Sequence, residues 1–286
     1  MRIVSEGLSF SYDPKSKHKI YALDCLNLTI EEGEFFGIIG QTGSGKSTFI
    51  QHLNALIPLQ EGKLFVGDFD LSPKQKGYKK QLGKLRSRVG MVFQYPEYQL
   101  FAESVFKDVA FGVNNFFPEL TAEQVEEKVK NAITAVGLDY ADVKNRSPFD
   151  LSGGQKRRVA IAGVLATEPD VLVLDEPVAG LDPLGKRTLM ALLHSIARPD
   201  RTIIIVSHDM DEVCENCTKI AVFEDGKLKT SGKPEEVFSS SAPHFRLELP
   251  LAAKVKNALA KVGCELDCKL DTEDLIDEIE RKFKNR

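Results

Sequence analysis

Runs of apolar residues divide the chain into strand and helix segments. Short runs rich in β-branched and aromatic residues predict strands, such as GLSFSY, LNLTI and GKLFVGDFDL within residues 7–71. Fully apolar runs predict buried strands, namely EFFGIIG (34–40), DVLVLDE (170–176) and RTIIIVSH (201–208). Because helical segments alternate with these buried strands, the pattern predicts an α/β protein with a parallel sheet covered on both faces.

Helix signals are strongest between residues 121 and 138. Thr121 and Gln124 fit a capping box, Gly137 fits the C-terminal cap, and apolar residues recur at helical spacing at Val125, Val129, Ala132 and Val136. A second helix is expected to begin at Pro183, with Asp182 as its N-cap. The segment KIAVFEDGKLKTSG (219–232) predicts a hairpin that turns at Asp225-Gly226.

The type of predicted secondary structure changes along the chain. The stretch 94–165 is predicted to be helical, and strand–helix alternation returns after it. The sequence SSSAPHF (239–245) is typical of a linker, and two short amphipathic helices are expected within 249–263 and 271–283. The second carries an apolar stripe of Leu275, Ile276, Ile279 and Phe283. The basic segments 15–19 and 72–88 are expected to be surface loops.

Composition narrows the class of protein. The chain of 286 residues has a net charge of −4, which argues against a main role in coating nucleic acid. No apolar run reaches about 18 residues and the N-terminus lacks a secretory signal, so we expect a cytosolic protein. The cysteine pairs Cys214/Cys217 and Cys264/Cys268 have helical spacing, which favours packing over a zinc site.

The loop GQTGSGKST (40–48) matches a phosphate-binding pattern. Gly40, Gly43, Gly45, Lys46 and Ser47 satisfy G-x-x-x-x-G-K-[ST], between a predicted buried strand and a predicted helix. In such loops backbone N–H groups surround the phosphates, the lysine adds charge, and the hydroxyl is offered to Mg²⁺. The alternative is a tight turn without a ligand.

Two carboxylates follow the strand VLVLD. Asp175 is expected at the carboxyl end of the strand, where ligands bind in such sheets, and Glu176 follows it directly. Beside a phosphate loop, this pair suggests a metal-holding aspartate and a glutamate that acts as base or positions water. His208 ends the next buried strand and is predicted to reach the same edge, although a structural role is the alternative.

A second glycine-rich motif carries a family resemblance. LSGGQ (151–155) resembles the signature sequence of the ATP-binding cassette ATPases. Tyr12 resembles the residue of that family that stacks on adenine, and Gln94 resembles the Q-loop glutamine. The segments LDEP (174–177), AGLDP (179–183) and SHD (207–209) resemble the Walker B, D-loop and H-loop segments, in the family's order, over about residues 1–240.

The resemblance implies a fold and a division of the chain. We expect a RecA-like P-loop ATPase core with an antiparallel β-subdomain over 1–93 and 166–240. A helical signature subdomain is expected over 94–165, and a small α-helical C-terminal domain that serves as a dimer clasp over 241–286. The implied enzyme is an ATPase whose hydrolysis is coupled to transmembrane transport.

The resemblance also assigns the site residues. Glu176, His208 and Gln94 are the expected catalytic residues, Ser47, Gln94 and Asp175 the expected Mg²⁺ ligands, and Asp182 belongs to the D-loop. ATP would be bound by Tyr12, Gly40, Thr42, Gly43, Ser44, Gly45, Lys46, Ser47 and Thr48. In this family two cassettes pair head to tail, so the signature residues would contact the ATP of the partner: Leu151, Ser152, Gly153, Gly154 and Gln155.

A narrower resemblance concerns the transporter type. FQYPEYQLFAESVFKDVAFG (93–112) and the short helical tail are similar to the ATPases of energy-coupling factor transporters, most of all to their second ATPase subunit. Those transporters import vitamins and transition-metal ions. The implied partners are a second ATPase subunit, in a heterodimer or a homodimer, an integral membrane coupling subunit and a substrate-binding membrane subunit.

The expected location is the peripheral, cytoplasmic face of the cell membrane, and no nucleic acid partner is expected. Two alternatives stay open: the ATPase of another importer or exporter, and a soluble cassette protein that acts on DNA or the ribosome. The second usually carries a coiled-coil insertion or two cassettes in one chain, and this sequence has neither.

Overall fold

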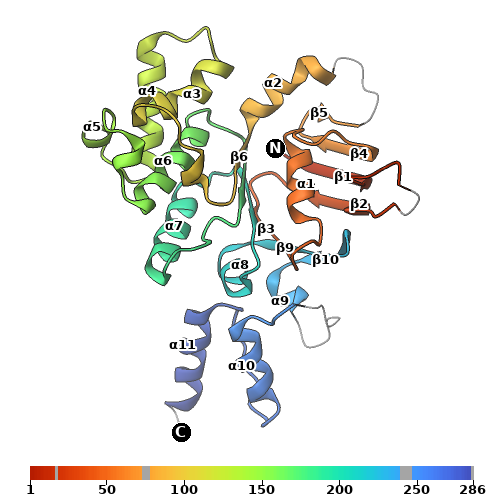
Figure 1. The fold of residues 1–286 in the computed structure, drawn as a ribbon. Helices are drawn as coiled ribbons and strands as arrows, with labels where there is room; N and C mark the ends of the chain where they lie inside the picture. Colours follow the sequence, from red (N-terminus) through yellow and green to blue (C-terminus); the bar gives the residue numbers. More distant parts are fainter. Residues whose placement is uncertain (17–18, 73–77, 239–246, 285–286) are drawn as a thin grey trace.

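Two β-sheets organise the fold of this computed structural model, which describes residues 1–16, 19–72, 78–238 and 247–284 (Figure 1). The strands are β1 Ile3–Phe10, β2 Leu23–Ile30, β3 Phe35–Gly40, β4 Glu61–Val66, β5 Phe69–Asp70, β6 Val89–Val92, β7 Val171–Asp175, β8 Thr202–Val206, β9 Lys219–Glu224 and β10 Lys227–Gly232. The helices are α1 Lys46–Leu53, α2 Tyr78–Arg88, α3 Val105–Phe116, α4 Ala122–Ala135, α5 Tyr140–Val143, α6 Gly153–Leu165, α7 Pro183–Ser195, α8 Met210–Asn216, α9 Pro234–Val237, α10 Leu251–Ala260 and α11 Thr272–Phe283. Two 3₁₀ turns are η1 Pro96–Gln99 and η2 Pro148–Asp150.

The larger sheet has the order β10-β9-β3-β8-β7-β6, and its strands are parallel except for the β9–β10 hairpin. Successive side chains of a strand point to opposite faces, and here both faces are covered. Phe35 and Ile39 of β3 pack in one apolar core, while Phe36 and Ile38 pack in the other. The predicted α/β class and the continuous apolar strands are therefore confirmed.

The smaller sheet is antiparallel, with the order β2-β1-β4-β5, and lies to one side of the larger sheet in Figure 1. A backbone hydrogen bond joins the two sheets, because the N–H of Asp24 donates to the carbonyl of Gly226 at 2.8 Å. Gly226 belongs to the predicted Asp225-Gly226 turn, where both residues have positive φ (51° and 75°) as a type I′ turn requires. The predicted hairpin is thus confirmed.

Helices α3 to α6 gather on the opposite side of the molecule from the smaller sheet (Figure 1). The capping box of α4 is present: Thr121 Oγ1 accepts from the N–H of Gln124, and Gln124 Oε1 accepts from the N–H of Thr121. Val129 and Ile133 of α4 are fully buried in the core that this layer shares with the larger sheet. The helix is therefore fixed both by its cap and by its apolar face.

The prediction of a surface loop over 72–88 is wrong for residues 78–88, because helix α2 spans Tyr78–Arg88. Leu85 is fully buried, and Arg86 donates to the carbonyls of Asn54 and Ala55 at 3.3 and 3.0 Å. Because five residues of this helix are basic, the sequence pattern did not reveal its short apolar face. Residues 73–77, and residues 17–18 of the other basic segment, lie outside the described residues.

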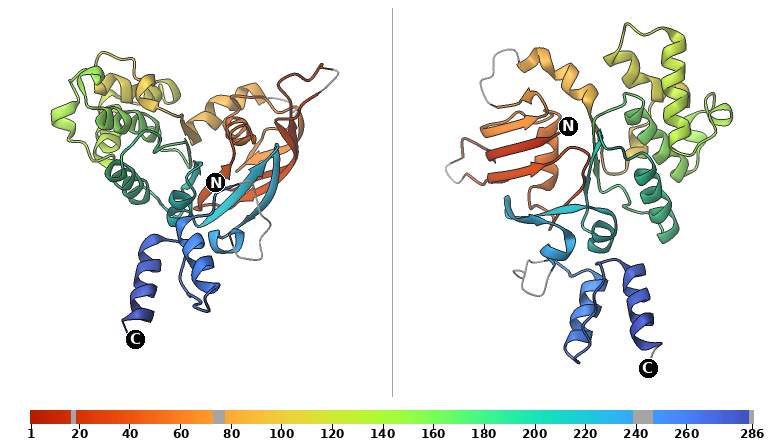
Figure 2. Two further views of the ribbon diagram at one scale, coloured as in Figure 1. Left: turned by 60° about the horizontal axis from the view of Figure 1, so that its bottom comes forward. Right: turned by 180° about the vertical axis from the view of Figure 1, so that it is seen from behind.

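The C-terminal helices α10 and α11 project away from the rest of the molecule in both views of Figure 2. Two hydrogen bonds attach these helices to α8. The N–H of Leu251 donates to Asp211 Oδ1 at 2.6 Å, and Thr272 Oγ1 donates to Glu215 Oε1 at 2.7 Å. The predicted linker 239–245 lies outside the described residues. Within the described part of the chain, no helix combines the length and the apolar character needed to cross a bilayer.

Candidate functional site

The phosphate loop occupies the sharp connection between β3 and α1. Gly45 is the N-cap of α1 and has φ of 101°, which favours glycine. A Cβ at this position would lie 2.4 Å from the carbonyl oxygen of Ala22, so a side chain is also excluded by space. The loop therefore brings its backbone N–H groups to the positive end of α1, as an anion site requires.

Lys46 is buried at the start of α1 and bridges the loop. Its Nζ donates to the carbonyls of Gly40 and Gln41 at 2.7 and 3.0 Å. Burial lowers the pKa of Lys46, while the carboxylates of Glu176 and Asp175 act in the opposite direction. A phosphate chain is the kind of anion that would offset the cost of burying this charge.

The predicted nucleotide residues meet at one cavity of about 510 Å³. Loop, strand-end and H-loop residues all contribute, although they come from widely separated parts of the chain. Gly40 does not line the cavity, and a Cβ at this position would lie 2.3 Å from the carbonyl oxygen of Phe223. The lining comprises Tyr12, Ala22, Thr42, Gly43, Ser44, Gly45, Lys46, Ser47, Thr48, Gln94, Asp175, Glu176 and His208.

Asp175 and Glu176, at the end of β7, lie in different environments. Burial raises the pKa of Asp175, and the hydrogen bond with Ser47 partly counteracts that shift. Glu176 Oε2 accepts a hydrogen bond from His208 Nδ1 at 2.8 Å. The backbone of Glu176 lies in the left-handed region with φ of 48°, and its N–H donates to the carbonyl of Val206 at 2.8 Å. The strand end thus holds the Glu176 carboxylate toward His208 at the edge of the cavity.

Tyr12 lines the cavity and is 66% exposed. Its hydroxyl and Thr48 Oγ1 are 3.0 Å apart, which places the ring beside the phosphate loop. An exposed aromatic face at this place suits stacking on a base, which the resemblance implied.

The signature residues are placed elsewhere. Ser152 caps α6: its Oγ accepts from the N–H of Gln155 at 3.3 Å, and Gln155 Oε1 accepts from the N–H of Ser152 at 3.0 Å. Ser152, Gly153 and Gly154 are exposed, while Leu151 is buried beneath them. None of these residues lines the cavity of the phosphate loop.

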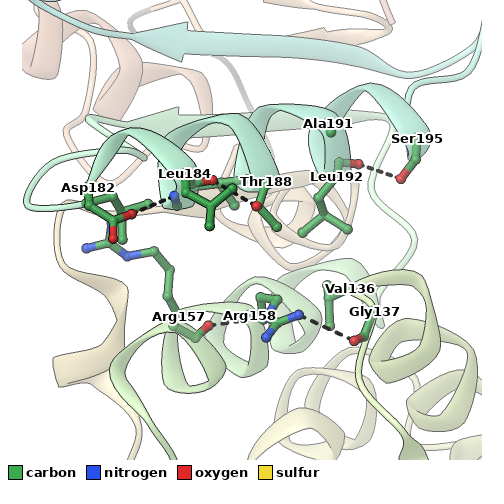
Figure 3. A pocket seen from close by; sticks show the side chains of 14 residues that line it. Val136, Gly137, Arg157, Arg158, Asp182, Leu184, Thr188, Ala191, Leu192 and Ser195 are labelled. Atoms are coloured by element: carbon green, nitrogen blue, oxygen red, sulfur yellow. Dashed lines mark hydrogen bonds between the residues drawn. The ribbon is translucent and has the colours of Figure 1, made fainter.

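Gly154 instead lines a second, mainly apolar cavity of about 520 Å³ between α6 and α7 (Figure 3). Asp182 lies at one end of this cavity, where its Oδ1 accepts from the N–H of Gly185 at 2.7 Å and caps α7 as predicted. That α6 and α7 face each other was not predicted, because no residue pattern connects segments that far apart in the chain.

A hydrogen-bond network behind His208, in which Ser207 and Glu212 are buried, was also not predicted from the sequence. Ser207 Oγ donates to Glu212 Oε2 and accepts from the N–H of Asp209, both at 3.1 Å. Asp209 Oδ2 accepts from Lys186 Nζ of α7 at 2.7 Å, and Asp209 Oδ1 caps α8 at the N–H of Glu212. The turn that carries His208 is therefore tied to both α7 and α8. In the sequence, the only sign of this connection was that Asp209 directly follows His208.

Stability should fall with rising pH because of Glu212. Burial is the main cause that raises the pKa of this carboxyl; Ser207 and Lys186 lower it, Asp209 and Glu176 raise it, and the resulting pKa is about 7. Between about pH 4.5 and 7 the unfolded chain loses this proton first, so the free energy of unfolding decreases by about 3 kcal/mol at most. Glu212→Gln removes this contribution.

We expect urea unfolding midpoints at pH 5 and 7.5 to differ less for Glu212→Gln than for the wild type. Glu119→Gln, a change at an exposed carboxylate, serves as the control and should keep the wild-type difference. An unchanged pH dependence in Glu212→Gln would show that this carboxyl titrates normally.

Comparisons with known proteins agree with this arrangement. A family model described as ABC transporter matches residues 23–179. The energy-coupling factor transporter ATP-binding protein EcfA2 of Symbiobacterium thermophilum is 49% identical over 265 residues, which cover 92% of this chain and 90% of that protein.

Two solved structures are similar throughout the cassette. CbiO1 of Clostridium perfringens, part of the ABC transporter complex cbiONQ, is 36% identical with a TM-score of 0.74, and the match covers 91% of this chain and 96% of that one. The ATP-binding cassette MJ0796, a dimer in a post-hydrolysis state bound to ADP and Pi, is 27% identical with a TM-score of 0.69. That match covers 81% of this chain and 98% of the other.

Proposed function

Because this chain belongs to the ABC transporter family, and within it to the energy-coupling factor transporter ATP-binding proteins, we propose that it powers uptake of micronutrients such as vitamins or transition-metal ions. Its reaction is ATP hydrolysis coupled to transport. The observation that carries the proposal is the single cavity that Lys46, Asp175, Glu176 and His208 share.

Within this site each residue has a proposed role. Lys46 and the loop N–H groups bind the phosphates, and the exposed ring of Tyr12 stacks on the base. Glu176 accepts a proton from the attacking water, and His208, which donates to Glu176, holds that carboxylate in place. Gln94 reaches the same cavity from the segment after β6 and positions the reacting groups.

The residues present fit Mg²⁺. Ser47, Asp175 and Gln94 offer a hydroxyl, a carboxylate and an amide oxygen, and oxygen ligands are those that this hard cation prefers. The hydrogen bond of Ser47 with Asp175 brings two of these donors together. The ion would neutralise charge on the phosphates of ATP.

The placement of the signature supports pairing of two cassettes. Ser152, Gly153 and Gly154 present an exposed helix N-terminus away from their own phosphate loop, so they would contact the γ-phosphate bound by a partner. We favour a heterodimer with a second ATPase subunit, and a homodimer is the alternative.

An exposed aromatic surface supports docking to an integral membrane subunit. Tyr95, Tyr98, Phe101 and Phe111 are 40%, 83%, 60% and 53% exposed and follow Gln94 closely in the chain. Phe101 and Phe111 also line a cavity of about 360 Å³ beside α3. Exposed apolar patches of this kind mark interaction sites, so the protein would act as a peripheral subunit at the cytoplasmic face of the membrane.

Purification from detergent-solubilised membranes tests the function. A tagged chain is expected to copurify with a second ATPase chain and integral membrane proteins, and the complex is expected to hydrolyse ATP. A dedicated pair of membrane proteins without a separate substrate-binding membrane subunit would favour another type of ABC transporter. Recovery with ribosomes or DNA, and without membrane proteins, would contradict the proposal.

The tail is proposed to be a dimer clasp over residues 241–286. In the predicted stripe, Leu275 is buried against the chain's own core, whereas Ile276 is 50% exposed. Leu251 and Val262 of the same tail are 50% and 77% exposed. Each such side chain would contribute about 1.5–3 kcal/mol on burial in a partner, before the entropy cost is subtracted.

Deleting residues 245–286 is therefore expected to leave ATP binding unchanged and to make the pairing of the two ATPase chains depend on nucleotide. Sedimentation of the truncated and full-length pairs, each with and without ATP, measures this difference. If the truncated pair stays fully associated without ATP, the tail packs on its own cassette and is not a clasp.

A further inference from the structure

Arg157 of α6 is a buried arginine with an unusual set of partners. Its side chain is 5% exposed, and its guanidinium forms a two-pronged pair with Glu97: Nε donates to Oε2 at 3.1 Å and Nη2 donates to Oε1 at 2.9 Å. Glu97 lies in η1, which follows the Q-loop glutamine Gln94. Although burial raises the pKa of Glu97, the hydrogen bond from Arg157 leaves that pKa below its ordinary value.

The same guanidinium holds a third segment. Nη1 donates to the carbonyls of Pro177 and Ala179, each at 3.0 Å, and Nη2 donates to the carbonyl of Ala179 at 3.0 Å. These carbonyls belong to the short connection between Glu176 and Asp182. One side chain therefore joins η1, the signature helix α6 and the connection that follows the proposed catalytic base.

Figure 3 shows how selective this contact is. The side chain of Arg157 leaves α6 toward the segment of Asp182, whereas the neighbouring Arg158 turns toward Gly137. Arg158 donates only weakly, to the carbonyls of Gly154 and Gly137, both at 3.4 Å. The basic run after the signature thus contains one surface arginine and one arginine that connects three segments.

The chemistry of arginine suits this connection. The guanidinium is planar and always charged, and it matches a carboxylate with two parallel bonds while its other N–H groups bind carbonyls. Because the group is buried, removing one partner leaves an unpaired charge, which is strongly unfavourable. A displacement of η1 therefore has to move α6 or the 177–181 connection with it.

We propose that Arg157 is a positioning residue for ATP hydrolysis, and that its pair with Glu97 couples η1 to the segment that carries Glu176 and to the signature helix. The proposal rests on the proposed function, because η1 belongs to the aromatic surface assigned to the membrane subunit. A partner that shifts η1 at that surface would reposition Glu176 through Arg157.

A kinetic double-mutant cycle tests the coupling, with ATP and Mg²⁺ and the assembled complex that copurifies with this chain. Glu97→Gln preserves shape and removes the charge. We expect it to lower kcat for ATP hydrolysis about tenfold or more and to leave KM for ATP within about twofold. Arg157→Gln is expected to cause a larger loss, and adding Glu97→Gln to it should change kcat by less than about twofold.

Two further variants sharpen the test. Arg157→Lys keeps the charge but loses the two-pronged geometry, so its kcat should lie between those of Arg157→Gln and the wild type. The exposed ion pair of Lys63 and Glu6, at 3.1 Å, provides the matched control. Lys63→Gln, Glu6→Gln and their combination should stay within about twofold of wild-type kcat.

Wild-type kcat in Glu97→Gln, or additive losses of Glu97→Gln and Arg157→Gln, would overturn the inference while the proposed function stands. If Glu97→Gln does not assemble, Glu97→Asp takes its place; it keeps the charge but loses the two-pronged geometry, so its kcat should lie below that of the wild type, and a wild-type kcat would again be the contrary result. A wild-type complex that does not hydrolyse ATP would instead contradict the proposed function, which keeps the two failures distinct.

Discussion

The Glu176→Gln chain is expected to bind ATP with near wild-type affinity and to lose almost all turnover. The amide has the shape of the carboxylate and still accepts the hydrogen bond from His208 Nδ1, which spans 2.8 Å in the wild type. It does not accept a proton from water at neutral pH, and loss of a general base typically lowers the rate by about 10²–10⁴-fold. ATP that is bound and not hydrolysed should also hold the paired cassettes closed.

Binding of labelled ATP and release of phosphate are to be measured on the same assembled complex. Lys46→Ala provides the contrast, because loss of a charge that faces the phosphates in the ground state should weaken ATP binding itself. Phosphate release by Glu176→Gln at a rate close to that of the wild type would remove Glu176 from its proposed role as base.

An isolated chain that carries Gly153→Asp is expected to bind ATP. In a pair of cassettes, however, the dimer is expected not to close and not to hydrolyse ATP. A Cβ at Gly153 would meet no atom within 4 Å, so the fold has room for the new side chain. A carboxylate in the first turn of α6 is even favourable for the helix. In a head-to-tail pair, however, its negative charge would face the partner's γ-phosphate, and we expect hydrolysis to fall about a hundredfold or more.

ATP binding to the isolated chain, ATP-dependent dimerisation and hydrolysis together distinguish the outcomes. Gly153→Ala is the matched control, because it adds a side chain without charge and should retain most of the dimerisation. If Gly153→Asp abolishes ATP binding by the isolated chain, the signature serves the chain's own nucleotide and the head-to-tail arrangement is wrong.

Local signals in the sequence predicted the framework well. The capping box of Thr121, the cap at Asp182 and the turn at Asp225-Gly226 are confirmed, because each depends on residues within a few positions of one another. The apolar strands also predicted the parallel sheet. The phosphate loop and the DE pair were expected at one edge, and the structure brings them to one cavity.

Contacts between distant segments were beyond these patterns. Arg157 and Glu97 are 60 positions apart, and each is an ordinary charged residue in its own segment. Glu212 resembles any polar residue of a short helix, yet it is buried behind His208. In the tail, helical spacing placed Leu275 and Ile276 in one stripe, but Leu275 is buried and Ile276 is 50% exposed, so the spacing did not tell which of them the chain itself covers.

The backbone of Glu176 is left-handed, with φ of 48°. Selection for stability and selection for activity should therefore favour different residues at this position. A residue with a Cβ gives up about 1–2 kcal/mol in this conformation, whereas glycine adopts it freely and asparagine tolerates it. A library of variants at position 176 that is sorted for resistance to heat should therefore enrich glycine and asparagine. The same library sorted for ATP turnover should return glutamate, so engineering for robustness alone would discard the activity.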